Sequence, residues 1–468
     1  MTRIRRSQVM TTALLFPAVF GAVSVNVGSA IILRLSIILA GTASMASELD
    51  VTVTPVSNRA EVGTSHNTSR AGEILPLTGV RIIAALWVVV FHIRGNLYVE
   101  FPELGRIVSP ILNHGDLGVD LFFALSGFVL TLNYVEKMGG RLNRRDTARF
   151  LWARLARVWP VYFVTLNIAA LWHGWLLMRG GPDPVAPEEF SVLSYLRQLT
   201  MVVMWTEPDS ERLTWNGPAW SISGEWLAYL LFPLFALLLL RLALVLRIRH
   251  LVMLGVMALF PAVLLALVSG TLYSPHLWVL RLLGSFVAGG IACLVARRVA
   301  RTRRNDTVTA WCSAGFTIGI VAILYLARLT GHERYHVLAV FLFAPLLIAL
   351  AVSGRGLSRV LSTRPFVLGG YISYSLYLVH MLLIEPIWWA QNVWPEVLAP
   401  QTVVTKLVFL SVPVVACVAA YAMWRWVEEP ARKTMRAMSK PPARPSPQLG
   451  NGAHDTGLDV PRPVHEPA

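Results

Sequence analysis

The chain has 468 residues, of which 55% are hydrophobic and only 14% are charged, and its mean hydropathy is +0.58. A soluble globular domain is nearer a quarter charged, and apolar runs of about 20 residues recur along most of this chain. We therefore expect an all-α polytopic membrane protein, and we exclude a β-barrel because the runs do not alternate.

The formal net charge of +15 does not indicate a nucleic-acid partner. Many of the arginines stand in short loops between apolar runs, where they act as topology signals and contact anionic membrane lipid. The three cysteines fall in apolar runs, so we expect neither a disulfide framework nor a metal site.

Ten runs are long and apolar enough to cross a membrane once each, and we expect them to form one bundle. In chain order they are 77–95, 116–134, 155–177, 220–240, 250–270, 278–296, 310–328, 336–353, 370–391 and 403–426. Boundaries of this kind are reliable to about four residues.

Lysine and arginine in the loops set the expected orientation. The loops after the second, fourth, sixth and eighth spans hold eighteen basic residues, whereas the longer loops on the other side hold seven. We therefore expect a multi-pass protein of the plasma membrane in which both ends of the ten-span core, and with them the C-terminus, face the cytoplasm. The acidic segment 178–219 would be the largest outer loop.

Three regions are expected along the chain. Residues 1–74 hold an apolar segment and a polar linker, and the apolar part fits an interfacial or hairpin segment, an extra span, or an over-extended start. Residues 75–433 form the membrane domain. Residues 434–468 are rich in proline and polar residues, so we expect a disordered cytoplasmic tail.

Two ionisable residues stand in the first span, Arg81 and His92. Eleven residues of helix make three turns plus about 20° and rise about 16 Å, so the two side chains share one face at different depths. Alone, Arg81 fits a snorkelling anchor and His92 fits an interhelical hydrogen bond. Their shared face favours a functional role, since ionisable groups inside a membrane usually line a cavity.

Two carboxylates are expected at the depth of His92. Asp120 opens the second span, and Glu225 follows Asn216 and Pro218 at the start of the fourth. An aspartate bonded to a histidine would orient the ring and raise its basicity. The plainer alternatives are a helix-start aspartate favoured by the helix dipole and a structural ion pair for the glutamate.

Further polar residues stand at other depths. Arg154 and Arg157, spaced i and i+3 before the third span, could grip a phosphate together, although they also fit a positively charged cytoplasmic loop. The stretch 371–380, "YISYSLYLVH", places hydroxyl groups and His380 in the ninth span, either as a buried polar network or as a site. The sequence thus predicts anion-binding arginines towards the cytoplasm and a histidine–carboxylate cluster towards the outside. This arrangement suits a reaction whose donor comes from the cytoplasm and whose acceptor is met further out.

With these residues in this order, the sequence resembles the acyltransferase-3 family of integral membrane O-acyltransferases. The stretches that carry the resemblance come in family order: Arg81-x10-His92, "GVDLFFALSGF", "RLARVWPVY", "WSISGEW", "ISYSLYLVH" and "VEEPARK". They span about residues 75–433. The chain departs from the family pattern at Thr78, where an acidic residue is usual, at Ile82, where glycine is common, and at Ala228, where an aromatic is common.

The resemblance implies acyl-CoA as donor and co-substrate, no tightly bound cofactor, and a hydroxyl acceptor that is often a sugar. The motif residues that it implies are Arg81, His92, Arg154, Arg157 and Glu225. His92 would act as general base on the acceptor, with Asp120 or Glu225 orienting the acceptor or the imidazole. The three arginines would bind the CoA phosphates. We expect substrate contacts from Trp220, Ser221, Tyr374 and His380.

Two other classes of function fit part of this pattern. A transporter or exporter of a glycolipid or small metabolite would also place ionisable groups at several depths, but the chain has no internal repeat. A glycosyltransferase or flippase acting on lipid-linked sugars usually needs acidic pairs in loops, and none stands out. Within the acyltransferase interpretation, the acceptor could be an envelope polysaccharide, a lipid-linked saccharide or a secreted molecule. The resemblance alone favours an acetyl group.

Overall fold

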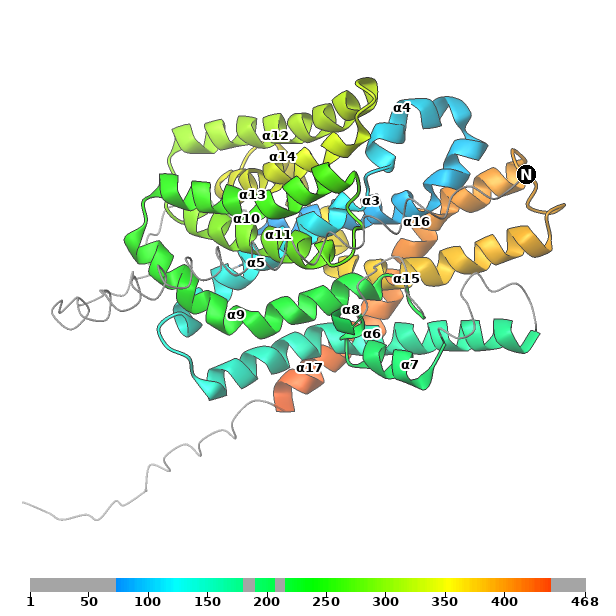
Figure 1. Ribbon diagram of the computed structural model, residues 1–468, viewed down its shortest axis with the longest axis horizontal. Helices are drawn as coiled ribbons and strands as arrows, with labels where there is room; N and C mark the ends of the chain where they lie inside the picture. Colours follow the sequence, from blue (N-terminus) through cyan, green and yellow to red (C-terminus); the bar gives the residue numbers. More distant parts are fainter. Residues whose placement is uncertain (1–72, 180–189, 207–214, 439–468) are drawn as a thin grey trace, which may run out of the picture. The chain divides into compact units, whose positions relative to one another are not determined.

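The structure, a computed structural model, describes residues 73–179, 190–206 and 215–438 (Figure 1). The described residues all belong to one compact unit. The expected N-terminal segment, apart from residues 73 and 74, and the tail beyond residue 438 lie outside the described residues.

Within the described ranges, 84% of the residues are helical and no strand occurs. The helices are α3 (Leu75–Glu100), α4 (Pro102–Leu112), α5 (Leu117–Met138), α6 (Arg144–Arg179), α7 (Val192–Leu199), α8 (Val203–Thr206), α9 (Ala219–Val245), α10 (Ile248–Ser269), α11 (Leu277–Ala296), α12 (Arg303–Leu329), η2 (Glu333–Leu342), α13 (Phe343–Val352), α14 (Leu357–Leu361), α15 (Arg364–Val393), α16 (Val403–Met423), η3 (Trp424–Glu428) and α17 (Glu429–Met438).

Ten of the described helical stretches are long and apolar enough to cross a membrane, and each overlaps one expected run. The expectation of an all-α polytopic membrane protein is therefore confirmed. Figure 1 shows α12 and α6 at opposite sides of this helical bundle.

The third span is longer than expected, because α6 runs unbroken through 36 residues from Arg144 to Arg179. At 1.5 Å per residue it extends about 54 Å, well beyond a hydrocarbon core of about 30 Å. Neither glycine nor proline interrupts residues 144–159, so the helix already forms where a loop was expected. Arg154 and Arg157 consequently lie about three turns inside a helix and not at its start.

Helices α5 and α11 approach each other closely at two glycines. A Cβ atom on Gly127 would lie 1.9 Å from the carbonyl oxygen of Phe286, and one on Gly289 would lie 1.9 Å from the carbonyl oxygen of Ala124. Small residues allow such backbone contact, which strengthens dispersion between helices in a membrane. Helices α3, α9, α10 and α13 pack around this pair.

Helix α3 connects this pair to a second group, in which it packs against α15 and α16. The contact with α15 is again close, because a Cβ atom on Gly370 would lie 1.9 Å from the carbonyl oxygen of Thr78. Helix α6 packs against α9 and α15 and completes the set of helices that surround the candidate site.

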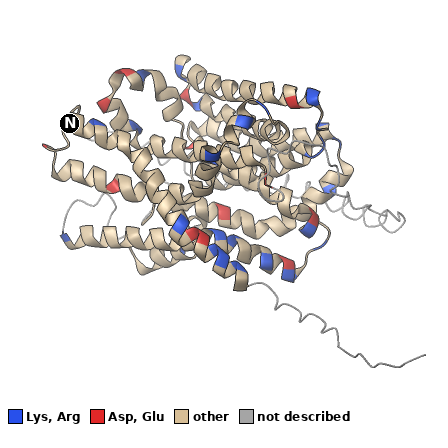
Figure 2. Ribbon diagram, turned by 180° about the vertical axis from the view of Figure 1, so that it is seen from behind, with Lys and Arg blue, Asp and Glu red and all other residues tan. Residues whose placement is uncertain are grey.

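The two ends of the bundle differ in charge. We call basic end the end at which α5, α9, α11 and α13 finish and α6, α10, α12 and α15 begin. The short helix α17 packs on α6 at this end, where the indole of Trp152 donates a hydrogen bond of 2.7 Å to the carbonyl oxygen of Met435. Lys and Arg gather along α17 and the beginning of α6 (Figure 2).

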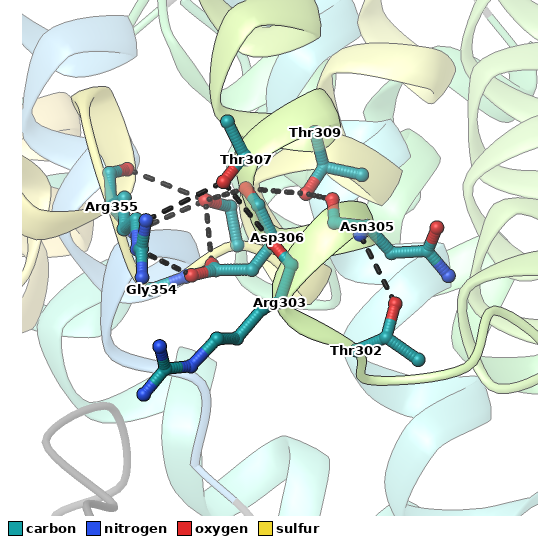
Figure 3. A network of polar contacts seen from close by, with 9 residues as sticks. Thr302, Arg303, Asn305, Asp306, Thr307, Thr309, Gly354 and Arg355 are labelled. Carbon is teal, nitrogen blue, oxygen red and sulfur yellow. Dashed lines mark hydrogen bonds and ion pairs between the residues drawn. The ribbon is translucent and has the colours of Figure 1, made fainter.

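A polar network holds the loops together at the basic end (Figure 3). Thr302 caps α12 by accepting a hydrogen bond of 3.2 Å from the backbone N–H of Asn305. The carboxylate of Asp306 accepts the N–H of Gly354 at 2.7 Å and pairs with the guanidinium of Arg355 at 2.8 Å. The start of α12 is thereby fixed to the loop that follows α13.

We predict that Gly289→Ala destabilises the bundle, because the new Cβ atom would meet a backbone carbonyl that cannot rotate away. Overpacking of this kind costs about 1–3 kcal/mol. Gly315→Ala in α12 is the matched control, since a Cβ atom there meets nothing within 4 Å. Equal midpoints of thermal unfolding for the two purified variants in detergent would contradict the close α5–α11 contact.

Candidate functional site

Two adjacent cavities lie among the helices that surround α3. The first contains about 790 Å³ of space, and its polar lining consists of Arg81, Ser126, Arg154, Arg157, Ser221, Glu225, Tyr229, Ser373, Tyr374 and Tyr377. The second contains about 920 Å³ and lies nearer the basic end, between the beginnings of α3 and α15 and the helices η3 and α17. Arg81, Val129 and Arg157 line both cavities, so the two spaces meet at these residues.

The first cavity contains the three arginines that the sequence singles out. Arg81 comes from α3, and Arg154 and Arg157 come from one face of α6. In the described part of the chain, the Arg81 guanidinium has no hydrogen bond and no ion pair. Arg154 donates to the hydroxyl of Tyr134 at 3.2 Å, while its buried Nε has no partner. Two of the three cations therefore keep donors available to an anion in the cavity.

Arg157 is already paired. Its guanidinium lies 3.2 Å from the carboxylate of Glu428, which is fully buried at the end of the π-helical turn η3. The other oxygen of Glu428 accepts a hydrogen bond of 2.8 Å from the hydroxyl of Ser375. π-Helical turns occur frequently at functional sites, and here the turn brings a C-terminal carboxylate to the boundary of the two cavities.

Glu225 faces the same cavity as the arginines. Its carboxylate accepts a hydrogen bond of 3.3 Å from Ser126 and a short one from the hydroxyl of Tyr229, one turn along α9. The structure thus brings Arg81, Arg154 and Arg157 together around one cavity, as the sequence predicts for the donor side. Glu225 was expected with His92 at the outer end of the bundle, and the structure corrects this: the carboxylate lines the cavity of the arginines, because depth along a helix does not specify which neighbours a side chain faces. Glu225 and His92 do not line a common cavity in the described structure.

His92 pairs with another histidine. Its ring centroid lies 4.8 Å from that of His380 on α15. The Nδ1 atoms lie 2.8 Å and 2.7 Å from the carbonyl oxygens of Val88 and Tyr377, respectively. We infer from these carbonyls that both Nδ1 atoms carry a proton, which leaves each Nε2 as an acceptor. The Nε2 of His380 is buried without a hydrogen-bond partner.

Tyr377 connects the histidine pair to the first cavity. Its hydroxyl lies 2.7 Å from that of Ser221 in the cavity wall, and its ring lies 5.8 Å from the ring of His380. Tyr374, one turn earlier, also lines the cavity and donates to the carbonyl oxygen of Val158 at 2.7 Å. The histidines therefore lie one layer of side chains behind the cavity wall.

Asp120 does not bind His92, which corrects the expectation from depth alone. Its carboxylate is fully buried and accepts bonds of 2.7 to 3.1 Å from the guanidinium of Arg281 on α11. Asp116 joins this pair, with an oxygen 3.2 Å from the same guanidinium. The arginine attracts the carboxylate more strongly than a neutral imidazole would, which is the physical reason for the correction.

A tyrosine closes this buried network from the loop between α10 and α11. The Tyr273 hydroxyl donates to Asp116 at 3.1 Å. Burial, together with the neighbouring carboxylate, raises the pKa of Tyr273 above its usual range, so the hydroxyl stays protonated. Trp220 stands beside the network, with its ring centroid 6.0 Å from the guanidinium carbon of Arg281.

Sequence reasoning missed two residues of this region, Arg281 and Glu428. Arg281 is a single charge inside an otherwise apolar span, and that position alone is a signal for a paired or functional group. Glu428 lies in the "VEEPARK" stretch, but its distance of 271 residues from Arg157 hides the pairing.

The site offers cationic donors in the cavity and an imidazole pair behind its wall, an arrangement suited to binding an anion and moving a proton. Among the described residues, there is no group of three or more His, Cys, Asp or Glu side chains that could hold a metal ion.

One protein family matches most of the chain. A family model described as an acyltransferase domain matches residues 75–423. Acyltransferase MdmB of Streptomyces mycarofaciens is 30% identical over 159 residues, which cover 34% of this chain and 38% of that protein. The chain thus matches less than half of the length of this relative.

A second relative, "Protein 2 in picA locus" of Rhizobium radiobacter, is 33% identical over 157 residues. The match covers 32% of this chain and 75% of that protein. No solved structure matches the chain.

We predict that Asp120→Asn lowers the stability of the protein and not only its activity. The substitution removes the nearer of the two counter-charges of the buried Arg281 and leaves only Asp116, and loss of hydrogen bonds to a charged group costs about 1.5–3 kcal/mol. The measurement is the thermal unfolding midpoint of purified protein in detergent. A variant as stable as the wild type but inactive would instead assign Asp120 to the chemistry.

Proposed function

The chain belongs to the acyltransferase-3 family, and from this premise we propose that it moves an acyl group from acyl-CoA to a hydroxyl group of a sugar-containing acceptor. The observation that carries the proposal is the pair of adjacent cavities in which Arg81, Arg154 and Arg157 gather, with the histidine pair about three helical turns from Arg81 along α3. Coenzyme A is a polyanion with a long neutral arm, so it matches a cationic cavity behind whose wall a proton acceptor lies.

The donor would enter from the basic end. Arg81 and Arg154 have uncommitted donors, and charge-assisted bonds from guanidinium to phosphate are among the strongest in proteins. With the phosphates held there, the acyl-pantetheine arm would extend through the first cavity towards Tyr377 and Ser221. The thioester would then lie at the wall formed by Tyr377 and Ser221, and a shift of the Tyr377 side chain would open it to the histidines behind that wall.

In the proposed reaction, His92 acts as general base. Its Nε2 takes the proton of the acceptor hydroxyl as the oxygen attacks the carbonyl carbon of the thioester. A C–O bond forms, the C–S bond breaks, and the proton passes to the departing CoA thiolate, which leaves as the free thiol. General base catalysis of this kind contributes about 10²–10⁴ in rate. Glu225, beside the arginines, would orient the donor side of the reacting groups.

The acceptor would reach the histidines from the opposite end. His92 lies eleven residues after Arg81 along α3, which is about 16 Å further from the basic end. The excess of basic residues in the loops supports a cytoplasmic basic end and C-terminus in the plasma membrane. Acyl-CoA would therefore come from the cytoplasm, and an envelope, lipid-linked or secreted saccharide would meet it deeper in the membrane. We propose acetyl as the transferred group.

We predict that His92→Ala abolishes the product in cells. Three strains would be compared at matched protein level by mass spectrometry of envelope glycans, lipids and secreted metabolites: wild type, a deletion and the His92→Ala strain. The expected result is a species that both mutants lack and whose mass exceeds that of its precursor by one acyl group. Turnover in membranes should fall about 10²–10⁴-fold, the usual loss for a general base.

Other outcomes would change the assignment. A product lost only from the deletion strain would make His92 structural and remove the proposed mechanism. Accumulation of an intact molecule inside the deletion strain, with no acyl difference, would indicate transport and overturn the proposed transfer reaction.

We predict that Arg154→Gln weakens donor binding more than it slows turnover. Hydrogen bonds to charged groups contribute about 1.5–3 kcal/mol, so the KM for acyl-CoA should rise about ten- to a hundredfold. Arg145→Gln is the matched control, because Arg145 is exposed on the first turns of the same helix. Initial rates in membranes at varied acyl-CoA give both constants, and equal KM values for the two variants would exclude a donor site at Arg154.

A further inference from the structure

The lining of the second cavity contains two aromatic rings, a carboxylate and three arginines. Trp424 of η3 and Tyr371 of α15 line it with nearly parallel rings, whose planes differ by 9° and whose centroids lie 6.4 Å apart. The carboxylate of Glu73 lies beside them and accepts a hydrogen bond of 3.1 Å from the Tyr371 hydroxyl. Flat aromatic faces of this kind stack nucleobases.

Cations stand on the side where the two cavities meet. Arg81 and Arg157 belong to both walls, and Arg432 reaches the second cavity from α17. Arg157 and Arg432 are paired with Glu428 and Glu429, whereas Arg81 has no ion pair in the described ranges. A ligand that fits must therefore be anionic at the boundary and neutral beside Glu73, because a phosphate placed against that carboxylate would be repelled.

We propose that the second cavity binds the adenine nucleotide portion of the CoA donor, an inference that rests on the proposed function. The adenine would stack on Trp424 and Tyr371, and its amino group would donate to Glu73. The pyrophosphate would lie at Arg81, where the cavities join, and the pantetheine arm would continue into the first cavity.

The shape of η3 explains how one short turn serves both cavities. Trp424 and Glu428 are the first and last residues of this π-helical segment. The first lines the second cavity, and the last pairs with Arg157 at the boundary. The C-terminal end of the domain thus contributes to donor binding at two points.

The test compares Trp424→Ala with Trp426→Ala, because Trp426 is 74% exposed two residues away and does not line the cavity. Each variant is assayed in membranes with acetyl-CoA and with S-acetyl-pantetheine, which lacks the nucleotide. Loss of base stacking should raise the KM for acetyl-CoA about five- to a hundredfold in Trp424→Ala. The KM for S-acetyl-pantetheine should stay the same in all proteins, and this constancy also reports correct folding.

A second readout uses adenosine 3′,5′-bisphosphate as a probe of the nucleotide portion alone. It should inhibit the wild type, Trp426→Ala and Trp424→Phe, which retains an aromatic face, and it should fail to inhibit Trp424→Ala. Unchanged inhibition and an unchanged KM in Trp424→Ala would overturn the nucleotide assignment while acetyl-CoA turnover by the wild type still supported the proposed function. A wild type that does not consume acetyl-CoA would overturn both.

Assays in nanodiscs with and without anionic lipid separate the remaining ligand source. One outcome would be that the bisphosphate does not inhibit and that the KM for acetyl-CoA depends on lipid charge only when Trp424 is present. The cavity would then bind a lipid headgroup, and the proposal would be wrong. A KM independent of lipid charge, with inhibition by the bisphosphate, supports the nucleotide site.

Discussion

A charged side chain inside an apolar helix bundle must be paired with an opposite charge or must face a cavity, since the effective desolvation penalty is several kcal/mol per ion. The structure meets this constraint in both ways. Arg281 is paired with Asp116 and Asp120, whereas Arg81 lines two cavities without an ion pair in the part of the chain that the structure describes. The first solution holds helices α5 and α11 together, and the second leaves a cation available to a ligand.

The close contact of α5 with α11 helps to hold the paired arginine, Arg281, in place. Gly127 and Gly289 let the two backbones touch, and the Asp120–Arg281 pair lies between the same helices. Helix α3 packs against this pair on one side and against α15 on the other. It therefore carries Arg81 into the cavities and His92 to His380 from one continuous segment. The spacing of eleven residues in one helix fixes the distance between the cationic region and the imidazole pair.

The sequence predicts the ten spans because each is a long apolar run, and hydrophobicity alone decides which segments enter a membrane. It also predicts that Arg154 and Arg157 share a face, because helical periodicity is local. Helical depth, however, does not specify which neighbouring helix a side chain meets. The expected partner of Asp120, His92, was therefore wrong, because Arg281 on α11 is a stronger partner. The pairing of Arg157 with Glu428 was missed because it depends on contacts between segments far apart in the sequence.

The pairing of Arg157 with Glu428 also constrains how the protein is made. The two residues are 271 positions apart, so at about 5–20 residues per second a ribosome needs roughly 15 to 55 s to add the second after the first. During that interval the inserted α6 carries Arg157 without this counter-charge. The cationic region receives the carboxylate at its boundary only when η3, the last segment before α17, has been synthesised. A truncated translation product that ends before Trp424 would therefore contain most of the helices but would lack both the buried counter-charge and the indole of the second cavity.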